Sequence, residues 1–312
     1  MTKLPQSRKG PGIERLPFSI IAQIILVMLL WAICFPLITV GIEYSPHLTF
    51  ATLRALLAGA ALTVLAVALR RPTPQTSGVW ISLVFVGLGA TSLGFLGMFH
   101  AAELVSPGIA TVIANTQPLM AAILAGFVLN ERLTRYGIIA LLLCFAGILM
   151  IASPQLLAVG GETYVVGIAY IILAALGITV SNVLLKRIAG QVDVLMAMGI
   201  QMLIGSIPLV FGAIATEDPM LVVWSPAFVT ALLVLSLPGT AFVYWLWFSI
   251  LGKVQLSRAN AYSFFVPVFG LTIGTLFFGE TLDIQQMVGF ALTVFGVALM
   301  TRRGIREANP LV

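Results

Sequence analysis

Two prolines, Pro118 and Pro267, lie inside long apolar stretches of the chain, 149 residues apart. Proline has no backbone N–H, so within a helix it leaves the carbonyl four residues earlier without its usual hydrogen bond. These carbonyls belong to Ala114 and Ser263, and one of them could hold an ammonium group of a bound molecule. Paired interruptions of this kind indicate a binding site in the middle of a membrane protein. A kink packed between helices explains the same prolines, since proline is frequent in membrane helices.

Aromatic side chains recur at the same spacing in both halves of the chain. Phe95 and Phe99 are four residues apart, so they share one face of a helix. The shift of 149 residues relates them to Tyr244 and Phe248. Rings on equivalent faces can line a shared cavity and stack on an apolar or aromatic ligand. Trp31 lies too deep in its apolar stretch for the interfacial belt, which indicates a place in the cavity or the core.

Several polar side chains interrupt the apolar stretches. Polar groups are costly in lipid, so these side chains are expected to face the protein interior. Asn115 and Tyr262, which lie near the two prolines, are the preferred contacts to a substrate. Gln117, Asn182 and Ser263 are further candidates. The alternative for each is an ordinary hydrogen bond between helices, worth less than about 2 kcal/mol.

Arg54 is the one basic residue deep inside an apolar stretch. Its guanidinium group could bind the carboxylate of a substrate through two hydrogen bonds. The favoured interpretation is that its long side chain reaches the outer interface of the membrane. By a similar argument, Trp247 is expected in the belt of aromatic residues at the inner interface.

No catalytic or metal-binding motif is found in the sequence. The HExxH, GxSxG and glycine-rich phosphate-loop patterns are absent. Cys34 and Cys144 are expected to be small buried residues, and His47 and His100 to be ordinary histidines near the outer ends of helices. The sequence therefore predicts neither an enzyme nor a site for a metal or cofactor.

The apolar stretches that carry these residues set the class of protein. Hydrophobic residues make up 60% of the chain and charged residues 9%, whereas soluble domains are nearer half apolar and a quarter charged. A bilayer core of roughly 30 Å needs about 20 apolar residues per helix, and helices satisfy their own backbone groups in lipid. The sequence predicts an all-α membrane protein with ten transmembrane helices, at about 19–41, 47–69, 78–100, 106–129, 135–152, 163–186, 193–214, 225–250, 257–278 and 285–301.

The basic residues predict the orientation, because cytoplasmic connections are rich in Lys and Arg. With the N-terminus inside, every basic residue except Arg54 falls on the cytoplasmic side, and the charged residues of the outer connections are all acidic. Both ends are therefore predicted to be cytoplasmic, as tails at 1–18 and 303–312. This distribution explains the net charge of +5, so the lipid bilayer is the expected partner and nucleic acid is not.

The chain also resembles itself when it is shifted by 149 residues. The shift relates Leu88, Pro118, Glu131 and Gly147 to Leu237, Pro267, Glu280 and Gly296. The two halves are predicted at 19–152 and 163–302, with five helices each. Five is an odd number, so the second half must enter the membrane upside down, which is a common transporter design. Glu131 and Glu280 lie at helix ends and are expected to cap or pair across short connections.

The paired segments resemble the signatures of the EamA family in the drug/metabolite transporter superfamily. The first segment runs from Ser106-Pro107-Gly108-Ile109-Ala110 through Pro118 to Asn130-Glu131-Arg132-Leu133. The second runs from Ser257-Arg258-Ala259 through Pro267 to Gly279-Glu280-Thr281-Leu282. The resemblance covers essentially the whole chain and implies ten helices and export of amino acids, other metabolites or toxic compounds. The halves differ before the proline, where the first is polar (Asn115-Thr116-Gln117) and the second aromatic (Phe264-Phe265-Val266), so the site is asymmetric.

The leading hypothesis is an exporter in the bacterial inner membrane that moves small metabolites, most of all aromatic and other neutral amino acids, by alternating access. Acidic residues are absent from the helix centres, and ion-driven carriers usually need one there, so facilitated or weakly coupled transport is expected. The protein is expected to be a monomer or a homodimer. Helices 5 and 10 would be outer supports in a monomer and would form the contacts of a homodimer. The alternatives are an exporter of cationic aromatic drugs and, in another class, a membrane enzyme or lipid scramblase.

Overall fold

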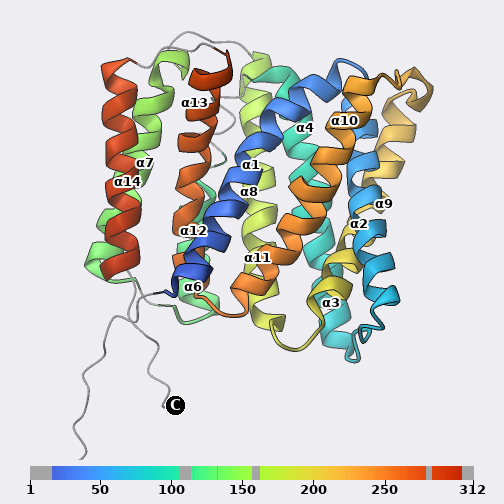
Figure 1. The fold of residues 1–312 in the computed structure, drawn as a ribbon, viewed down its shortest axis with the longest axis horizontal. Helices are drawn as coiled ribbons and strands as arrows, with labels where there is room; N and C mark the ends of the chain where they lie inside the picture. Colours follow the sequence, from blue (N-terminus) through green and yellow to red (C-terminus); the bar gives the residue numbers. More distant parts are fainter. Residues whose placement is uncertain are drawn as a thin grey trace, which may run out of the picture.

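The computed structural model describes residues 16–105, 114, 116–131, 133–156, 162–278 and 283–303. Every regular element in this part of the chain is a helix (Figure 1). Six helices are long and apolar enough to cross a membrane. They are α1 (Phe18–Ile42), α2 (His47–Ala68), the stretch Ser77–Leu104, α8 (Glu162–Ile188), α9 (Val194–Thr216) and the stretch Pro226–Leu251.

Two of these membrane-length helices contain a short π-helix. The first consists of α3 (Ser77–Val86), η1 (Gly87–Leu93) and α4 (Gly94–Leu104). The second consists of α10 (Pro226–Ser236), η3 (Leu237–Phe242) and α11 (Val243–Leu251). A shift of 149 residues superposes η3 on residues 88–93 of η1, so the same irregularity recurs in both halves. Such π-bulges are frequent at functional sites.

The proline-containing segments are also interrupted. Pro118 is the second residue of α6 (Gln117–Val128). In the other half, α12 (Leu256–Ala261) passes through the 3₁₀ turn η4 (Tyr262–Phe264) into α13 (Phe265–Phe278), so Pro267 lies in the first turn of α13. Both prolines thus occupy helix starts, where the missing N–H costs little, and not the middle of an unbroken helix as predicted. The Ser263 carbonyl accepts the Phe265 N–H.

The remaining helices, α7 (Arg135–Leu156) and α14 (Ile284–Arg303), pack along each other at one edge of the molecule (Figure 1). A Cβ atom at Gly147 would lie 2.5 Å from Thr293 Oγ1, and one at Gly296 would lie 2.5 Å from Cys144 Sγ. The 149-residue shift relates Gly147 to Gly296 and Cys144 to Thr293. These contacts are therefore reciprocal, as expected for two halves related by a two-fold axis.

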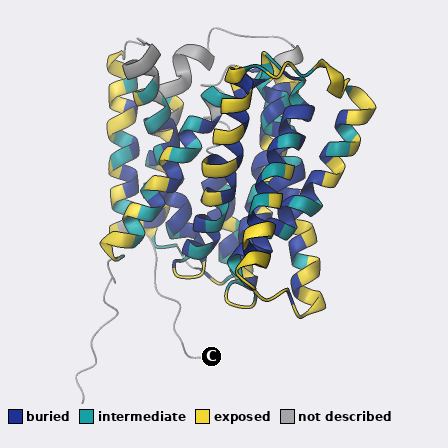
Figure 2. Ribbon diagram, turned by 45° about the vertical axis from the view of Figure 1, so that its right-hand side comes forward, coloured by how far each residue is buried: buried dark blue, intermediate teal, exposed yellow. Residues whose placement is uncertain are grey.

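The two ends of the molecule differ in which segments they carry. α1 begins and α14 ends at the same side, the lower one in Figure 1. By the predicted topology this is the cytoplasmic side, and it is called the inner end below; the opposite end is called the outer end. Large apolar residues such as Phe127 and Phe211 are 83% and 70% exposed. Exposed residues recur along the helices that form the outside of the molecule (Figure 2). This surface suits lipid.

The structure confirms the all-helical membrane class. Each of the ten predicted segments contains helix in its described part, but the number of membrane crossings and the inverted relation of the halves stay predictions. The predicted tails (except residues 16–18 and Arg303), Asn115 and Glu280 lie outside the described residues.

Candidate functional site

A cavity of about 140 Å³ lies in the middle of the helical bundle. Its lining comes from both halves of the chain. It consists of Trp31, Cys34, Ile38, Arg54, Phe95, Met98, Ala114, Gln117, Ile171, Ala174, Ala175, Ile178, Asn182, Tyr244, Asn260, Ser263 and Val266.

Helical spacing explains which residues reach this cavity. The lining residues of α8 are Ile171, Ala174, Ala175, Ile178 and Asn182, which recur every three or four positions and so lie on one face. The two alanines on that face leave space that larger side chains would fill. The same helix approaches α4 closely, because a Cβ atom at Gly97 would collide with the Tyr170 carbonyl.

Among the described residues, Arg54 is the only cation in the cavity lining, and it is 4% exposed. Its Nε donates to Thr240 Oγ1 at 2.8 Å, and its Nη2 lies 3.6 Å from Cys34 Sγ. The guanidinium carbon lies 4.6 Å from the ring centre of Phe95. No carboxylate pairs with it among the described residues. The prediction that Arg54 reaches the outer interface is therefore wrong, because hydrogen bonds and aromatic contacts hold its side chain inside.

Each π-helix holds one polar side chain from the opposite half of the chain. Thr240 belongs to η3, and its hydroxyl donates to the Leu235 carbonyl, five residues earlier, while it accepts from Arg54. Thr91 is the shift-related residue of η1, and its hydroxyl donates to Gln201 on α9 at 3.0 Å. Gln201 is fully buried and does not line the cavity. The two shift-related threonines thus bind different side chains of the opposite half, a charged guanidinium group at Thr240 and a neutral amide at Thr91.

Amide side chains form a second polar group in the cavity lining. Gln117 and Asn260 each have a buried side-chain nitrogen that finds no hydrogen-bond partner in the described part of the chain. Ser263 Oγ donates to the Asn260 carbonyl at 2.6 Å. Buried polar atoms are normally satisfied, so unpaired amides that face a cavity indicate that a ligand or water completes them.

Trp247 is 3% exposed and forms part of the wall behind the cavity. Its Nε1 donates to Asn182 Oδ1 at 3.0 Å, and its ring centre lies 5.3 Å from that of Trp31. The expectation of an interfacial position for Trp247 is therefore wrong. The indole instead orients Asn182 and supports Trp31, both of which line the cavity.

The cavity unites most of the residues that the sequence analysis selected. Its lining includes Trp31, Arg54, Phe95, Gln117, Asn182, Tyr244 and Ser263. Phe99, Phe248 and Tyr262 are buried but do not line it. Phe99 packs instead against Phe50 and Phe95, and Tyr262 packs against Phe265.

Sequence reasoning missed several lining residues, among them Cys34, Met98 and the α8 alanines. Cys34 and Ile38 follow Trp31 by three and seven positions, so the helical face of Trp31 could have revealed them. The alanines carry no chemical signal, and only the packing of α8 identifies them.

Below the cavity, the connection between α11 and α12 is held from two sides. The Glu131 carboxylate accepts the N–H groups of Leu256 and Ser257 and the Ser257 hydroxyl, at 2.8 to 2.9 Å. Lys186 Nζ donates to the carbonyls of Leu251 and Val254, each at 2.6 Å. The acidic group thus caps a helix start and the basic group a helix end, as the helix dipole favours. The expectation that Glu131 caps a helix is confirmed.

Comparison with known proteins places the chain among transporters. The profile of the EamA-like transporter family matches residues 18–153 and again residues 165–302. The uncharacterized transporter YvbV of Bacillus subtilis is 25% identical over 287 residues, which cover 89% of this chain and 90% of that protein. A protein of Salmonella typhimurium named as a probable amino-acid metabolite efflux pump is 28% identical, over 88% of this chain and 91% of its own length.

A plant protein and a solved structure extend this comparison. The chloroplastic WAT1-related protein At3g02690 of Arabidopsis thaliana is 31% identical over 80% of this chain and 61% of its own length. One solved protein structure superposes with a TM-score of 0.76 at 20% identity, covering 91% of this chain and 96% of that one. At this identity the superposition establishes the fold alone.

Proposed function

We propose that this chain, which belongs to the EamA-like transporter family, exports small zwitterionic metabolites, with neutral and aromatic amino acids as the main class. The family makes it a membrane transporter and not an enzyme. Arg54 is the observation that carries the substrate proposal. A buried guanidinium without a carboxylate partner among the described residues is costly unless an anion completes it.

The cavity offers a separate contact for each part of an amino acid. Arg54 supplies donors for the α-carboxylate. The amide nitrogens of Gln117 and Asn260, which have no partner among the described residues, can donate to acceptor atoms of the substrate. Trp31, Phe95 and Tyr244 supply aromatic surface for the side chain, and aromatic faces also attract cations.

The size of the cavity favours small metabolites over large drugs. It measures about 140 Å³, whereas sites for drug-sized ligands typically span roughly 300–1,000 Å³. Cationic drugs are disfavoured further because the charged residue of the lining is itself a cation.

We assign transport to alternating access without strong ion coupling. The described part of the cavity lining contains no Asp or Glu, and carriers that bind a driving ion usually place a carboxylate in the membrane. Amino acids would then leave down their own gradient. The bacterial relatives favour the inner membrane as the location, and α7 with α14 offers an exposed edge for a homodimer.

The proposal is tested with purified protein in liposomes, by exchange of labelled amino acids across the bilayer. The competitors are an amino acid, its amide without the carboxylate, and a quaternary ammonium drug. Unchanged protein should prefer the acid over the amide at least tenfold. Arg54→Met should remove this preference, and Arg54→Lys should retain part of it, because lysine keeps the charge but not the paired donors.

The control is Arg187→Met, which changes an exposed basic residue and should leave transport unchanged. Equal competition by acid and amide in the unchanged protein would refute the role of Arg54. Transport of the drug but not of amino acids would favour the multidrug alternative. Movement of labelled lipid without solute transport would favour a scramblase.

A further inference from the structure

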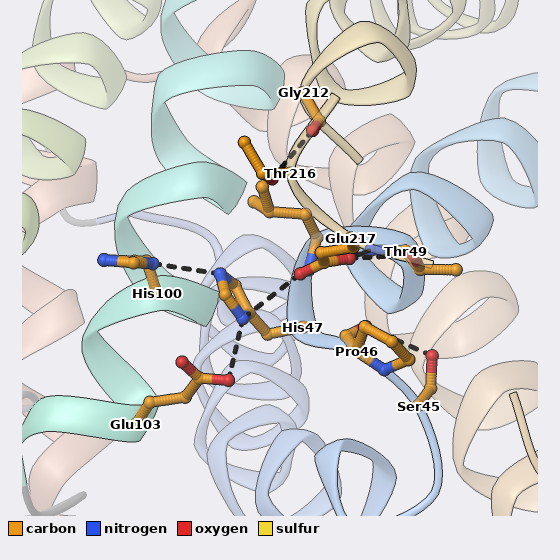
Figure 3. Close-up of polar contacts among 10 residues, drawn as sticks. Ser45, Pro46, His47, Thr49, His100, Glu103, Gly212, Thr216 and Glu217 are labelled. Atoms are coloured by element: carbon orange, nitrogen blue, oxygen red, sulfur yellow. Dashed lines mark hydrogen bonds and ion pairs between the residues drawn. The ribbon is translucent and has the colours of Figure 1, made fainter. Parts of the chain in front are cut away.

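Both histidines of the chain meet at the outer end, outside the cavity (Figure 3). His47 is the first residue of α2, and His100 lies near the end of α4. His100 Nδ1 is 2.9 Å from His47 Nε2. On the other edge of the His47 ring, Nδ1 lies 2.7 Å from Glu103 Oε1 and 3.3 Å from Glu217 Oε1.

These contacts determine where the hydrogens lie. His47 Nδ1 faces two carboxylates, which only accept hydrogen bonds, so Nδ1 must carry a hydrogen. In a neutral imidazole the other nitrogen is then an acceptor. His47 Nε2 therefore accepts, and His100 Nδ1 must donate to it. This leaves His100 Nε2 as the ring nitrogen that can take up the next proton.

The two carboxylates beside the pair favour that uptake. Both carboxylates pair with His47, and neither pairs with a lysine or arginine among the described residues. Glu217 is partly compensated, because it accepts the N–H groups of Leu48 and Thr49 at the start of α2. Among the described residues, no backbone N–H group donates to Glu103, whose charged partner is His47. With neutral histidines the group carries an excess negative charge that one bound proton would reduce.

The cluster joins three helices from both halves of the chain. His47 starts α2, His100 and Glu103 belong to the end of α4, and Glu217 directly follows α9. The titratable side chains that face the pair are Glu103, Glu217 and Tyr170, whose ring centre is 4.3 Å from that of His100. α2 and α4 also carry Arg54 and Phe95 of the cavity lining.

We propose that His47 and His100 form a single proton-binding site at the outer end of the molecule, and that the bound proton holds the ends of α2, α4 and α9 together. A proton that adds to His100 Nε2 is shared along the chain from His100 through His47 to the two carboxylates. The hydrogen bond between His100 Nδ1 and His47 Nε2 makes the two rings share this one proton. When the proton leaves, the attraction between His47 and the carboxylates weakens, and the three helix ends separate more readily. The site is independent of the substrate in the cavity.

A divalent metal ion is the competing ligand. Ligand atoms of His47, His100 and Glu103 lie within 4.8 Å of one another. A metal would need the His–His hydrogen bond to break, however, because a nitrogen that ligates a metal cannot also donate or accept in that bond. The proton therefore fits the observed contacts with less rearrangement.

Nitrogen NMR of protein labelled with ¹⁵N-histidine tests the proposal directly. The chain has only two histidines, so a preparation with a histidine-free tag shows the cluster alone. We expect a through-hydrogen-bond coupling between His47 Nε2 and His100 Nδ1. Both rings should respond to the same first proton as the pH is lowered. In Glu103→Gln this first response should need a lower pH than in the unchanged protein, because the variant loses a nearby negative charge.

The control variant is Glu43→Gln, which changes an exposed carboxylate at the same end and should leave the spectrum unchanged. Amide hydrogen exchange at residues 100–104, compared at one pH, should be faster in Glu103→Gln than in Glu43→Gln. Two rings that titrate independently, or a coupling that appears only after Zn²⁺ is added, would overturn the proposal. Neither readout requires a transported substrate.

Discussion

At the scale of single residues, Arg54 shows that a repeated structural element can carry different chemistry in the two halves. Thr91 and Thr240 occupy the same place in the two π-helices, and each hydroxyl bonds a polar side chain of the opposite half. In one half this partner is Gln201, away from the cavity; in the other it is Arg54, which lines it. The π-helix and its threonine are therefore repeated in both halves, but only one of the two bonded side chains, Arg54, reaches the cavity.

This pairing supplies a matched experiment on the two threonines. Thr240→Val removes the acceptor of Arg54 Nε without changing the size of the side chain. We expect amino-acid affinity to fall about tenfold, which corresponds to about 1.4 kcal/mol, the scale of one hydrogen bond to a charged group. Thr91→Val should lower the free energy of unfolding by a similar amount but leave the affinity for the amino acid unchanged. Equal losses of affinity in both variants would contradict the assignment.

At the scale of elements, the broken helix α12–η4–α13 depends on a side chain from the other half. The start of α12 would leave N–H groups without partners, and Glu131 accepts two of them together with the Ser257 hydroxyl. Glu131 is 6% exposed, so water cannot replace it easily. The carboxylate thus fixes the position of the helix that carries Asn260 to the cavity.

Replacing this carboxylate should loosen the inner end. Glu131→Gln exchanges an acceptor oxygen for a donor, which leaves at least one buried N–H or hydroxyl unsatisfied. We expect a loss of about 1–3 kcal/mol, measured as a lower melting temperature in detergent, and faster amide exchange at residues 254–260. Ser257→Ala removes one of the three bonds and should cost less. A variant as stable as the unchanged protein would show that the cap is dispensable.

At the scale of the whole molecule, the two halves make reciprocal contacts. Gly147 meets Thr293 and Gly296 meets Cys144, and the two π-helices occupy shift-related positions. Two halves of opposite orientation around one cavity can give inward-open and outward-open states of similar energy, which is the usual basis of alternating access.

The predicted orientation is open to a labelling test. Cys144 is 0% exposed, but Cys34 lines the cavity. The test therefore uses Cys34→Ser as its background, which should not react with a membrane-impermeant maleimide. Met220→Cys, at an 88% exposed position of the outer end, should react in intact cells. Gln75→Cys, in an exposed connection at the inner end, should react only after the membrane is opened. Reaction of both from the same side would refute the topology.

The sequence by itself determined the class and much of the cavity. Composition and apolar stretches of about 20 residues dictate membrane helices, and the 149-residue shift reveals the two related halves. Helical periodicity then selects faces such as that of Trp31. These features are local or repetitive, so they can be read along the chain without knowing which helices are neighbours.

Only the tertiary structure decided which polar groups meet. Arg54 and Trp247 were expected at the membrane interfaces, because the sequence gives only their positions along their own helices. In the structure, Arg54 bonds Thr240 and Trp247 bonds Asn182, and both partners are buried and distant in sequence. Tyr262 was chosen because it lies near Pro267, yet it turns into packing against Phe265. His47 and His100 were expected to be separate interfacial residues, but the packing of α2 against α4 brings them into hydrogen-bond contact. A hydrogen bond needs a partner within about 3 Å, and sequence position does not give that distance.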